Sequence, residues 1–179
     1  PMRLLVSREG DCYKVLPSKN GETAFSGLLE LRETPKGPRP AKLRVRRDGD
    51  DETRQPDEFV DLARMADDVL YPASADGFGE MAELLDAYGV GLMREEVCRL
   101  CLVNDRFTSL RKNDAVLYDG ERICVDCARE ELRREASFRG VSSTTRDRPD
   151  DLLRRVGEVD KVVGLLDGSL DPELTTFDG

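Results

Sequence analysis

The first third of the chain alternates apolar and polar positions with the period of two that is typical of β-strands. Within residues 41–47, Leu43 and Val45 alternate with basic side chains, so one face of this segment should be buried and the other strongly basic. Asn-Gly at residues 20–21, a strong hairpin signal, separates two apolar runs. The expected strands lie at residues 3–8, 12–16, 23–32 and 41–47, with a Pro/Gly loop at 35–40. This pattern predicts a small four-stranded antiparallel sheet over residues 2–47.

Apolar residues return at helical spacing further along the chain. Residues 48–55 are polar and are interpreted as a linker or long loop. The expected elements after it are a helix at residues 57–69 opened by Pro56, a helix at 77–88 ended by Gly89, and a strand at 91–97. A helix at 128–138 stopped by Gly140, a polar linker at 141–147, a helix from Pro149 to 156 and a short helix at 159–166 follow.

These elements predict an α+β fold: an antiparallel N-terminal sheet, a helical middle, a cysteine module and a short helical C-terminus. The expected parts are an N-terminal β subdomain (residues 1–47), a helical segment (56–90), the cysteine module (91–140) and a C-terminal helical segment (148–179). We find no internal repeat and no low-complexity tract.

The amino-acid composition limits the classes of protein to which this chain can belong. The 179 residues include 39% hydrophobic residues, enough for a modest core, and carry a formal net charge of −9. This charge argues against non-specific nucleic-acid binding by the whole surface, although a local basic patch is compatible with it. No apolar run approaches the roughly 20 residues that a membrane-spanning helix needs, and no signal peptide is recognised. We therefore expect a soluble, cytoplasmic protein that does not contact a membrane.

The absence of certain residue types and motifs excludes several common classes of active site. There is no His, which excludes Ser-His-Asp and Cys-His catalysis and His-ligated metals. There is no GxxxxGK[ST] segment and no GxGxxG after a predicted strand, so the segment has no nucleotide-phosphate loop. We expect no active site within these residues. Arg greatly outnumbers Lys, and Asp outnumbers Glu, which fits either a salt-adapted cytoplasm or a genome rich in GC.

Two Cys-x2-Cys pairs carry the most specific signal in the chain. Cys98 and Cys101 form the first pair, and Cys124 and Cys127 the second. Zinc binds four thiolate or imidazole ligands in a tetrahedron, and without His the ligand set can only be four cysteines. Two such pairs close a four-coordinate site without an open position. The spacing therefore predicts one structural Zn²⁺ rather than a catalytic metal.

The surroundings of the two pairs indicate a treble-clef or zinc-ribbon-like module. The first pair follows a predicted strand, and the second runs directly into the predicted helix at 128–138. Between them, Asp119-Gly120 marks a hairpin turn. A helix N-terminus favours negative charge, so it should stabilise Cys127 as a thiolate.

Three alternatives compete with zinc. Two disulfides would need an oxidising compartment, and nothing in the sequence indicates secretion. An iron or iron–sulfur site shares the ligand set, but the Gly and Pro neighbours usual around such cysteines are missing. Buried thiols without a metal are the third. Cys12 stands apart from both pairs and is interpreted as a small buried apolar residue.

Other charged residues give weaker signals. Six basic residues are candidates for contacts with nucleic-acid phosphates: Arg44, Arg46, Arg47, Arg106, Arg111 and Lys112. The alternative, which we favour, is that these side chains form surface ion pairs with the many carboxylates. The adjacent carboxylates of Glu95-Glu96 and Asp150-Asp151 are interpreted as solvated surface, because neighbouring side chains do not face each other.

Several segments together resemble the N-terminal accessory region of archaeal superfamily-two DExH-box helicases of the Ski type. The segments are Cys98-Arg-Leu-Cys101, Arg106-Phe-Thr108, Gly120-Glu-Arg-Ile-Cys-Val-Asp-Cys-Ala-Arg-Glu-Glu-Leu132, Val159-Asp-Lys-Val-Val163 and Asp171-Pro-Glu-Leu-Thr175. The last two are similar to the connector that leads into the motor core. The helicase motifs themselves are not in the sequence, so residues 148–179 would form a helical connector toward a missing helicase core.

The resemblance implies a zinc-bearing accessory module of an ATP-dependent RNA or DNA helicase. Its four zinc ligands would be the cysteines of the two pairs. Relatives of this type are linked with archaeal RNA processing and decay, so the implied partners are the helicase core of the parent chain, RNA and an exoribonuclease. The alternative is a stand-alone zinc-finger adaptor for protein–protein interaction, without a motor.

Overall fold

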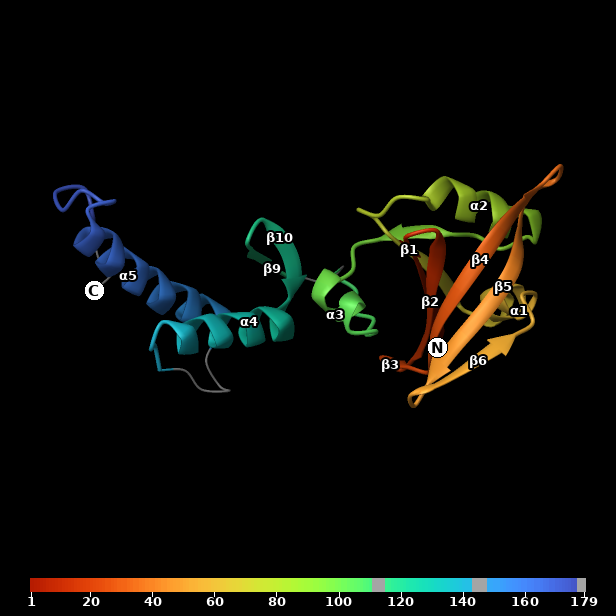
Figure 1. Ribbon diagram of the computed structural model, residues 1–179, viewed down its shortest axis with the longest axis horizontal. Helices are drawn as coiled ribbons and strands as arrows, with labels where there is room; N and C mark the ends of the chain where they lie inside the picture. Colours follow the sequence, from red (N-terminus) through yellow and green to blue (C-terminus); the bar gives the residue numbers. More distant parts are fainter. Residues whose placement is uncertain (111–114, 143–147, 177–179) are drawn as a thin grey trace. The chain divides into compact units, whose positions relative to one another are not determined.

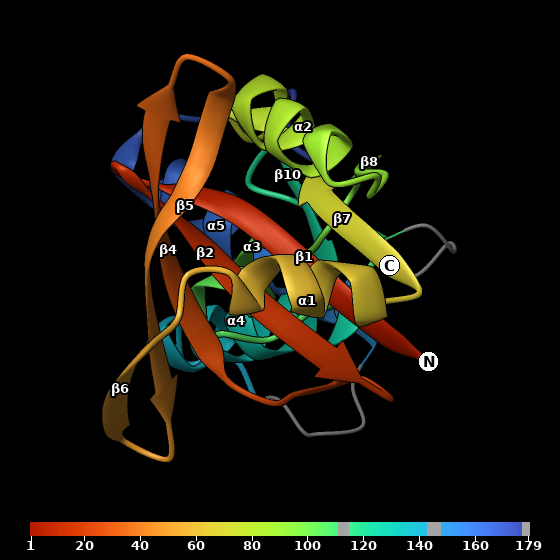
Figure 2. The ribbon, with the colours of Figure 1, turned by 90° about the vertical axis from the view of Figure 1, so that its right-hand side faces the viewer.

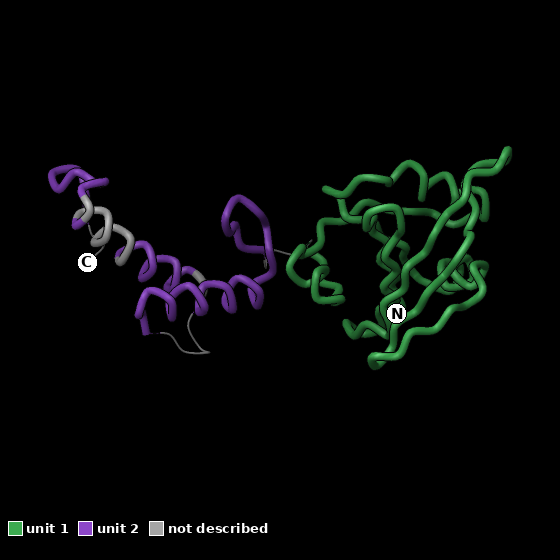
Figure 3. The backbone as a smooth tube through the Cα atoms, in the orientation of Figure 1, with its two compact units in different colours: residues 1–113 green, residues 114–179 purple. Residues whose placement is uncertain are grey.

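The computed structural model describes residues 1–110, 115–142 and 148–176. The chain forms two compact units, Pro1–Asn113 and Asp114–Gly179 (Figures 1 and 3). The fold is α+β, as the sequence predicts.

A mixed sheet of eight strands dominates the first unit. The strands are β1 (Met2–Glu9), β2 (Cys12–Lys19), β3 (Glu22–Thr23), β4 (Ser26–Thr34), β5 (Gly37–Arg47), β6 (Asp50–Arg54), β7 (Asp68–Pro72) and β8 (Met93–Glu95). Their order is β6-β5-β4-β2-β1-β7-β8, and β3 pairs with β2. Pairing is antiparallel from β6 to β1, whereas β7 joins β1 and β8 joins β7 in parallel.

The prediction of a small four-stranded antiparallel sheet is wrong in size and in strand direction. The four expected strands are present as β1, β2, β4 and β5 and pair antiparallel, but β3, β6, β7 and β8 enlarge the sheet. Residues 48–55 are a hairpin and not a linker: Asp48 and Gly49, with φ of 51° and 86°, form the turn into β6. The loop predicted at 35–40 is mostly strand, because β5 starts at Gly37.

The helix predicted at residues 57–69 is shorter in the structure. Helix α1 (Glu58–Met65) ends before the predicted boundary, and β7 follows it. The run Val69-Leu70-Tyr71 in β7 is buried on consecutive positions, so it has no period of two to mark it as a strand. A strand covered on both faces gives such a continuous apolar run. Helix α2 (Phe78–Ala87) confirms the helix predicted at 77–88.

The two faces of the sheet bury separate apolar clusters. Leu4 and Val6 of β1 belong to the main cluster, which also includes residues of α1 and α2. Both helices lie on the same face of the sheet (Figure 2). Leu5, between them in sequence, points to the opposite face and forms a second cluster with Leu16 and Leu70. Alternation along β1 thus separates the two cores. The second cluster matters for the metal centre because the segment carrying the first cysteine pair packs against it.

The start of α2 is held to the sheet by a polar network. The Tyr13 hydroxyl donates to the carboxylate of Glu80, and Arg8 donates to both groups, at 3.1 Å and 3.2 Å. Burial and the bond to Glu80 raise the pKa of Tyr13. Gly77 lies against this network with φ +86°, and a Cβ there would stand 2.8 Å from Arg8 Cδ. Only glycine suits this position without strain.

The second unit contains a hairpin and two helices. They are β9 (Ala115–Tyr118), β10 (Glu121–Cys124), α4 (Val125–Phe138) and α5 (Pro149–Asp167). The Asp119-Gly120 turn predicted from sequence joins the two strands, with φ of 49° and 79°. Leu132 and Ala136 of α4 pack with Leu152 and Val156 of α5 in a small core. The two C-terminal helices predicted at 149–156 and 159–166 are one continuous helix, α5.

Candidate metal centre

The first cysteine pair lies on a tight knuckle at the start of a short helix, α3 (Arg99–Val103). Cys98 is the N-cap residue, and its carbonyl accepts the N–H of Leu102 at 3.1 Å. The chain then reverses direction, and the N–H of Arg106 donates to the carbonyl of Cys101 at 2.8 Å. Cys98 is 0% exposed and Cys101 4%. The knuckle therefore presents two buried sulfurs from one turn of backbone.

The segment before the knuckle pairs with the segment after it. Val97 and Ser109 form an antiparallel bridge, and the N–H of Leu110 donates to the carbonyl of Glu96 at 2.9 Å. The Ser109 hydroxyl donates to the carboxylate of Glu95 at 2.6 Å. Glu95 is only 2% exposed, so the interpretation of this carboxylate as solvated surface is wrong. Its partner lies fourteen residues away in sequence, and no local pattern reveals such a contact.

The knuckle is also anchored to the sheet. Leu102 of α3 and Phe107, which follows the knuckle, are partly buried against Leu5, Leu16 and Leu70. These three residues are the second apolar cluster of the first unit. The position of the first cysteine pair therefore depends on apolar packing as well as on backbone hydrogen bonds.

The second cysteine pair lies where β10 becomes α4. Cys124 ends the strand and is the N-cap residue of the helix, and its Sγ accepts the N–H of Cys127 at 3.5 Å. Cys127 lies in the first helical turn, where the amide dipoles favour a thiolate. Both side chains are buried, at 7% and 5% exposure. The helix begins at Val125, three residues before the predicted start at 128, because the second cysteine pair forms part of its first turn.

The four sulfur atoms form one cluster. The Sγ atoms of Cys98, Cys101, Cys124 and Cys127 all lie within 4.8 Å of one another, and all four side chains are buried. A zinc–sulfur distance of about 2.3 Å in a tetrahedron separates the sulfurs by about 3.8 Å. The four thiols therefore fit a metal ion in both number and spacing. Among the described residues, which include all five cysteines, there is no disulfide.

Cys12 lies apart from this cluster, on β2 opposite Glu9 of β1. Its side chain is half-buried, so the prediction of a small buried apolar residue is only partly correct.

The three candidate arginines of β5 are engaged by carboxylates. Arg44 pairs with Glu30 at 3.6 Å, Arg47 approaches Asp48 at 4.0 Å, and Arg46 pairs with Asp51. The Arg46–Asp51 contact is bidentate, at 2.9 Å and 3.4 Å, and it lowers the pKa of the Asp51 carboxyl. The other three candidates differ in setting: Arg106 is exposed, and Arg111 and Lys112 lie outside the described residues.

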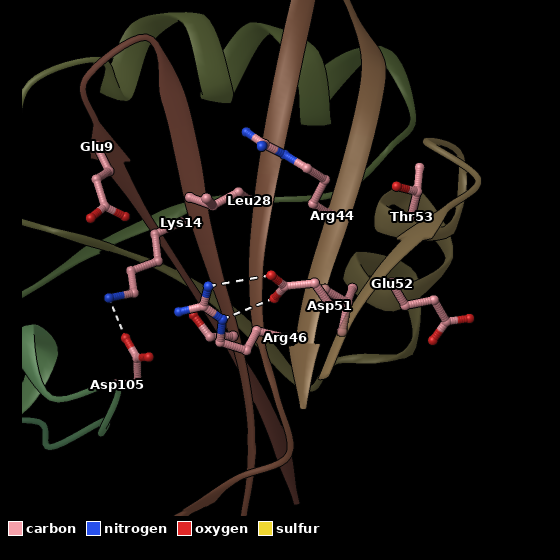
Figure 4. A pocket seen from close by; sticks show the side chains of 11 residues that line it. Glu9, Lys14, Leu28, Arg44, Arg46, Asp51, Glu52, Thr53 and Asp105 are labelled. Carbon is pink, nitrogen blue, oxygen red and sulfur yellow. Dashed lines mark hydrogen bonds and ion pairs between the residues drawn. The ribbon is translucent and has the colours of Figure 1, made fainter. Parts of the chain in front are cut away.

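A concavity of about 280 Å³ lies beside these pairs on the first unit (Figure 4). Figure 4 shows Arg46 turned toward Asp51, and Lys14 turned toward Asp105, with which it forms an ion pair. The charged residues lining the hollow have both signs: Lys14, Arg44 and Arg46 against Glu9, Asp51, Glu52 and Asp105. Such mixed charge does not concentrate positive potential and is a poor match for a phosphate backbone.

Comparison with known proteins gives one relationship and two negative results. The chain is 30% identical over 102 residues to a probable ATP-dependent helicase from Methanocaldococcus jannaschii. The matched segment is 55% of this chain and 12% of the length of that relative. No protein-family model matches the chain, and no solved structure matches it significantly. Among the described residues we find no helix whose length and hydropathy would let it span a bilayer. The chain thus has a four-cysteine cluster suited to a metal ion and a partial similarity to a probable archaeal helicase.

Proposed function

We propose that this chain is a non-catalytic, zinc-binding accessory module of an ATP-dependent helicase and docks a partner to the motor. The observation that carries the proposal is the cluster of four buried cysteine sulfurs within 4.8 Å of one another. The similarity to a probable ATP-dependent helicase supplies the link to a motor.

The donor set favours a structural zinc ion. Soft thiolates select zinc or iron among the metals common in cells, and four of them leave no position for water or substrate. Cys98 and Cys101 would hold the ion from the knuckle, and Cys124 and Cys127 from the start of α4. When bound, zinc supplies folding free energy to the segments that ligate it. The order of knuckle, hairpin and helix supports a treble-clef module.

A protein is the better-supported partner. Arg44, Arg46 and Arg47 already face carboxylates, which weakens the case for phosphate contacts by β5. Both units also expose large apolar side chains, including Met65 at 70% in the first and Phe138 at 90% in the second. Exposed apolar groups of this kind favour contact with another protein surface when they gather on one face. The resemblance to Ski-type helicases suggests a nuclease as that partner, with RNA as the substrate of the motor.

Metal analysis with matched cysteine variants tests the metal-binding part. The purified chain should contain one equivalent of zinc, and Cys101→Ser should lose most of it. Cys12→Ser is the control. Cys12 is outside the sulfur cluster, so this substitution should leave the zinc content unchanged. A chain that binds no metal, and unfolds identically with and without a chelator, would remove the proposed metal centre.

The link to a helicase needs a separate test. The natural reading frame should continue into DExH helicase motifs, and the full-length protein should hydrolyse ATP when RNA or DNA is added. In that protein, Cys101→Ser should reduce recovery of the bound partner and leave ATP hydrolysis close to wild type. A natural gene without a motor would instead favour the stand-alone adaptor.

A further inference from the structure

Thr108 contacts both cysteines of the first pair. Its hydroxyl donates to Cys101 Sγ at 3.3 Å, and its backbone carbonyl accepts the N–H of Cys98 at 2.9 Å. The side chain is half-buried. Thr108 belongs to a segment that resembles the helicase family, but its contact with the sulfur is not predicted by the sequence, because it lies seven positions after the cysteine.

The backbone that carries the Thr108 side chain is held by the residues on both sides of it. The neighbouring Ser109 is bridged to Val97 and bonded to Glu95, and Phe107 packs on the second apolar cluster. The backbone of Thr108 is therefore fixed from both sides. A preorganised hydroxyl loses little freedom when it bonds to the sulfur, so the bond is stronger than one from a mobile side chain.

We infer that Thr108 is a positioning residue of the metal centre and tunes the thiolate of Cys101. This inference rests on the proposed metal site. A hydrogen bond to a metal-bound thiolate stabilises its negative charge, makes the sulfur less nucleophilic and fixes its orientation toward the ion, as partners outside the ligand shell do at other metal sites. The hydroxyl of Thr108 therefore strengthens retention of the ion and lowers the reactivity of Cys101 toward electrophiles.

Three variants separate the hydroxyl from the fold. Thr108→Val removes the hydroxyl in a side chain of nearly the same shape and keeps the backbone bond to Cys98. Thr108→Ser keeps a hydroxyl. Ser109→Ala is the matched control, because it deletes the neighbouring hydroxyl, which donates to the Glu95 carboxylate.

Cobalt(II) is the probe, since its thiolate charge-transfer absorption reports directly on the sulfurs. We expect Thr108→Val to bind cobalt roughly tenfold more weakly and to shift the charge-transfer band. Treatment of the loaded protein with iodoacetamide, followed by peptide mass spectrometry, should show faster alkylation of Cys101. Thr108→Ser should restore the wild-type band and affinity, and Ser109→Ala should keep the wild-type band even if its melting temperature falls.

The outcomes distinguish this inference from the proposal beneath it. A Thr108→Val protein with wild-type affinity, band and Cys101 reactivity would overturn the inference and leave the metal site standing. A wild-type chain that takes up no cobalt would overturn both. If the valine variant does not fold, Thr108→Ala removes the same hydroxyl in a smaller side chain, and the same readings apply.

Discussion

Anchoring of the cysteine knuckle to the sheet predicts opposite outcomes for two neighbouring aliphatic residues of α3. Leu102 is partly buried against the second apolar cluster, whereas Val103, the next residue, is 69% exposed. Truncating a fully buried leucine to alanine costs about 2–5 kcal/mol. For the partly buried Leu102 we expect Leu102→Ala to lower the free energy of unfolding by about 2 kcal/mol, the lower end of this range. Val103→Ala should change the free energy of unfolding by less than about 0.5 kcal/mol.

Urea unfolding of the metal-loaded chain measures the difference. With a denaturant slope of about 2 kcal/mol per molar, the loss at Leu102 moves the midpoint by about 1 M, and Val103→Ala leaves it nearly unchanged. The apparent cobalt affinity of Leu102→Ala should fall as well, because the knuckle is less often in its folded arrangement. Equal midpoints for the two variants would refute the packing of the knuckle on the sheet.

The remaining predictions concern strain, pH and nucleic acid. Gly77→Ala combines a φ of +86° with a contact at 2.8 Å and should lose about 2 kcal/mol in urea unfolding, whereas Gly79→Ala, with open space around it, should lose none. Burial and a hydrogen bond from its hydroxyl to Glu135 raise the pKa of Tyr118 to about 12 from 10.0. The folded state therefore keeps this proton longer than the unfolded chain, so stability should fall between pH 10 and 12, and Tyr118→Phe should flatten the fall. RNA affinity should change little with salt and be unaffected by Arg46→Ala; a logarithmic slope near −2 would instead indicate about three phosphate contacts.

Local signals in the sequence were sufficient for part of the fold. The alternation around Leu43 and Val45 correctly predicts which face of β5 is buried. The turns at residues 20–21 and 119–120 adopt the positive φ values that Asn, Asp and Gly tolerate. The four candidate metal ligands follow from cysteine spacing alone, because two Cys-x2-Cys pairs are typical of a metal site.

Non-local pairing accounts for most of the errors. The parallel addition of β7 to β1 joins segments about 65 residues apart, and it buries β7 on both faces, so no amphipathic pattern is visible. β6 is entirely polar or charged and is a strand only because a tight turn at Asp48-Gly49 returns it to β5. The bond from the Thr108 hydroxyl to Cys101 Sγ likewise joins residues seven positions apart, and no spacing pattern in the sequence predicts that contact.

The central claim, that four cysteines hold one metal ion, is tested most directly by X-ray absorption at the zinc edge of the purified chain. The account predicts a single shell of four sulfur atoms at about 2.3 Å from zinc. A shell containing oxygen or nitrogen, or fewer than four sulfurs, would contradict it.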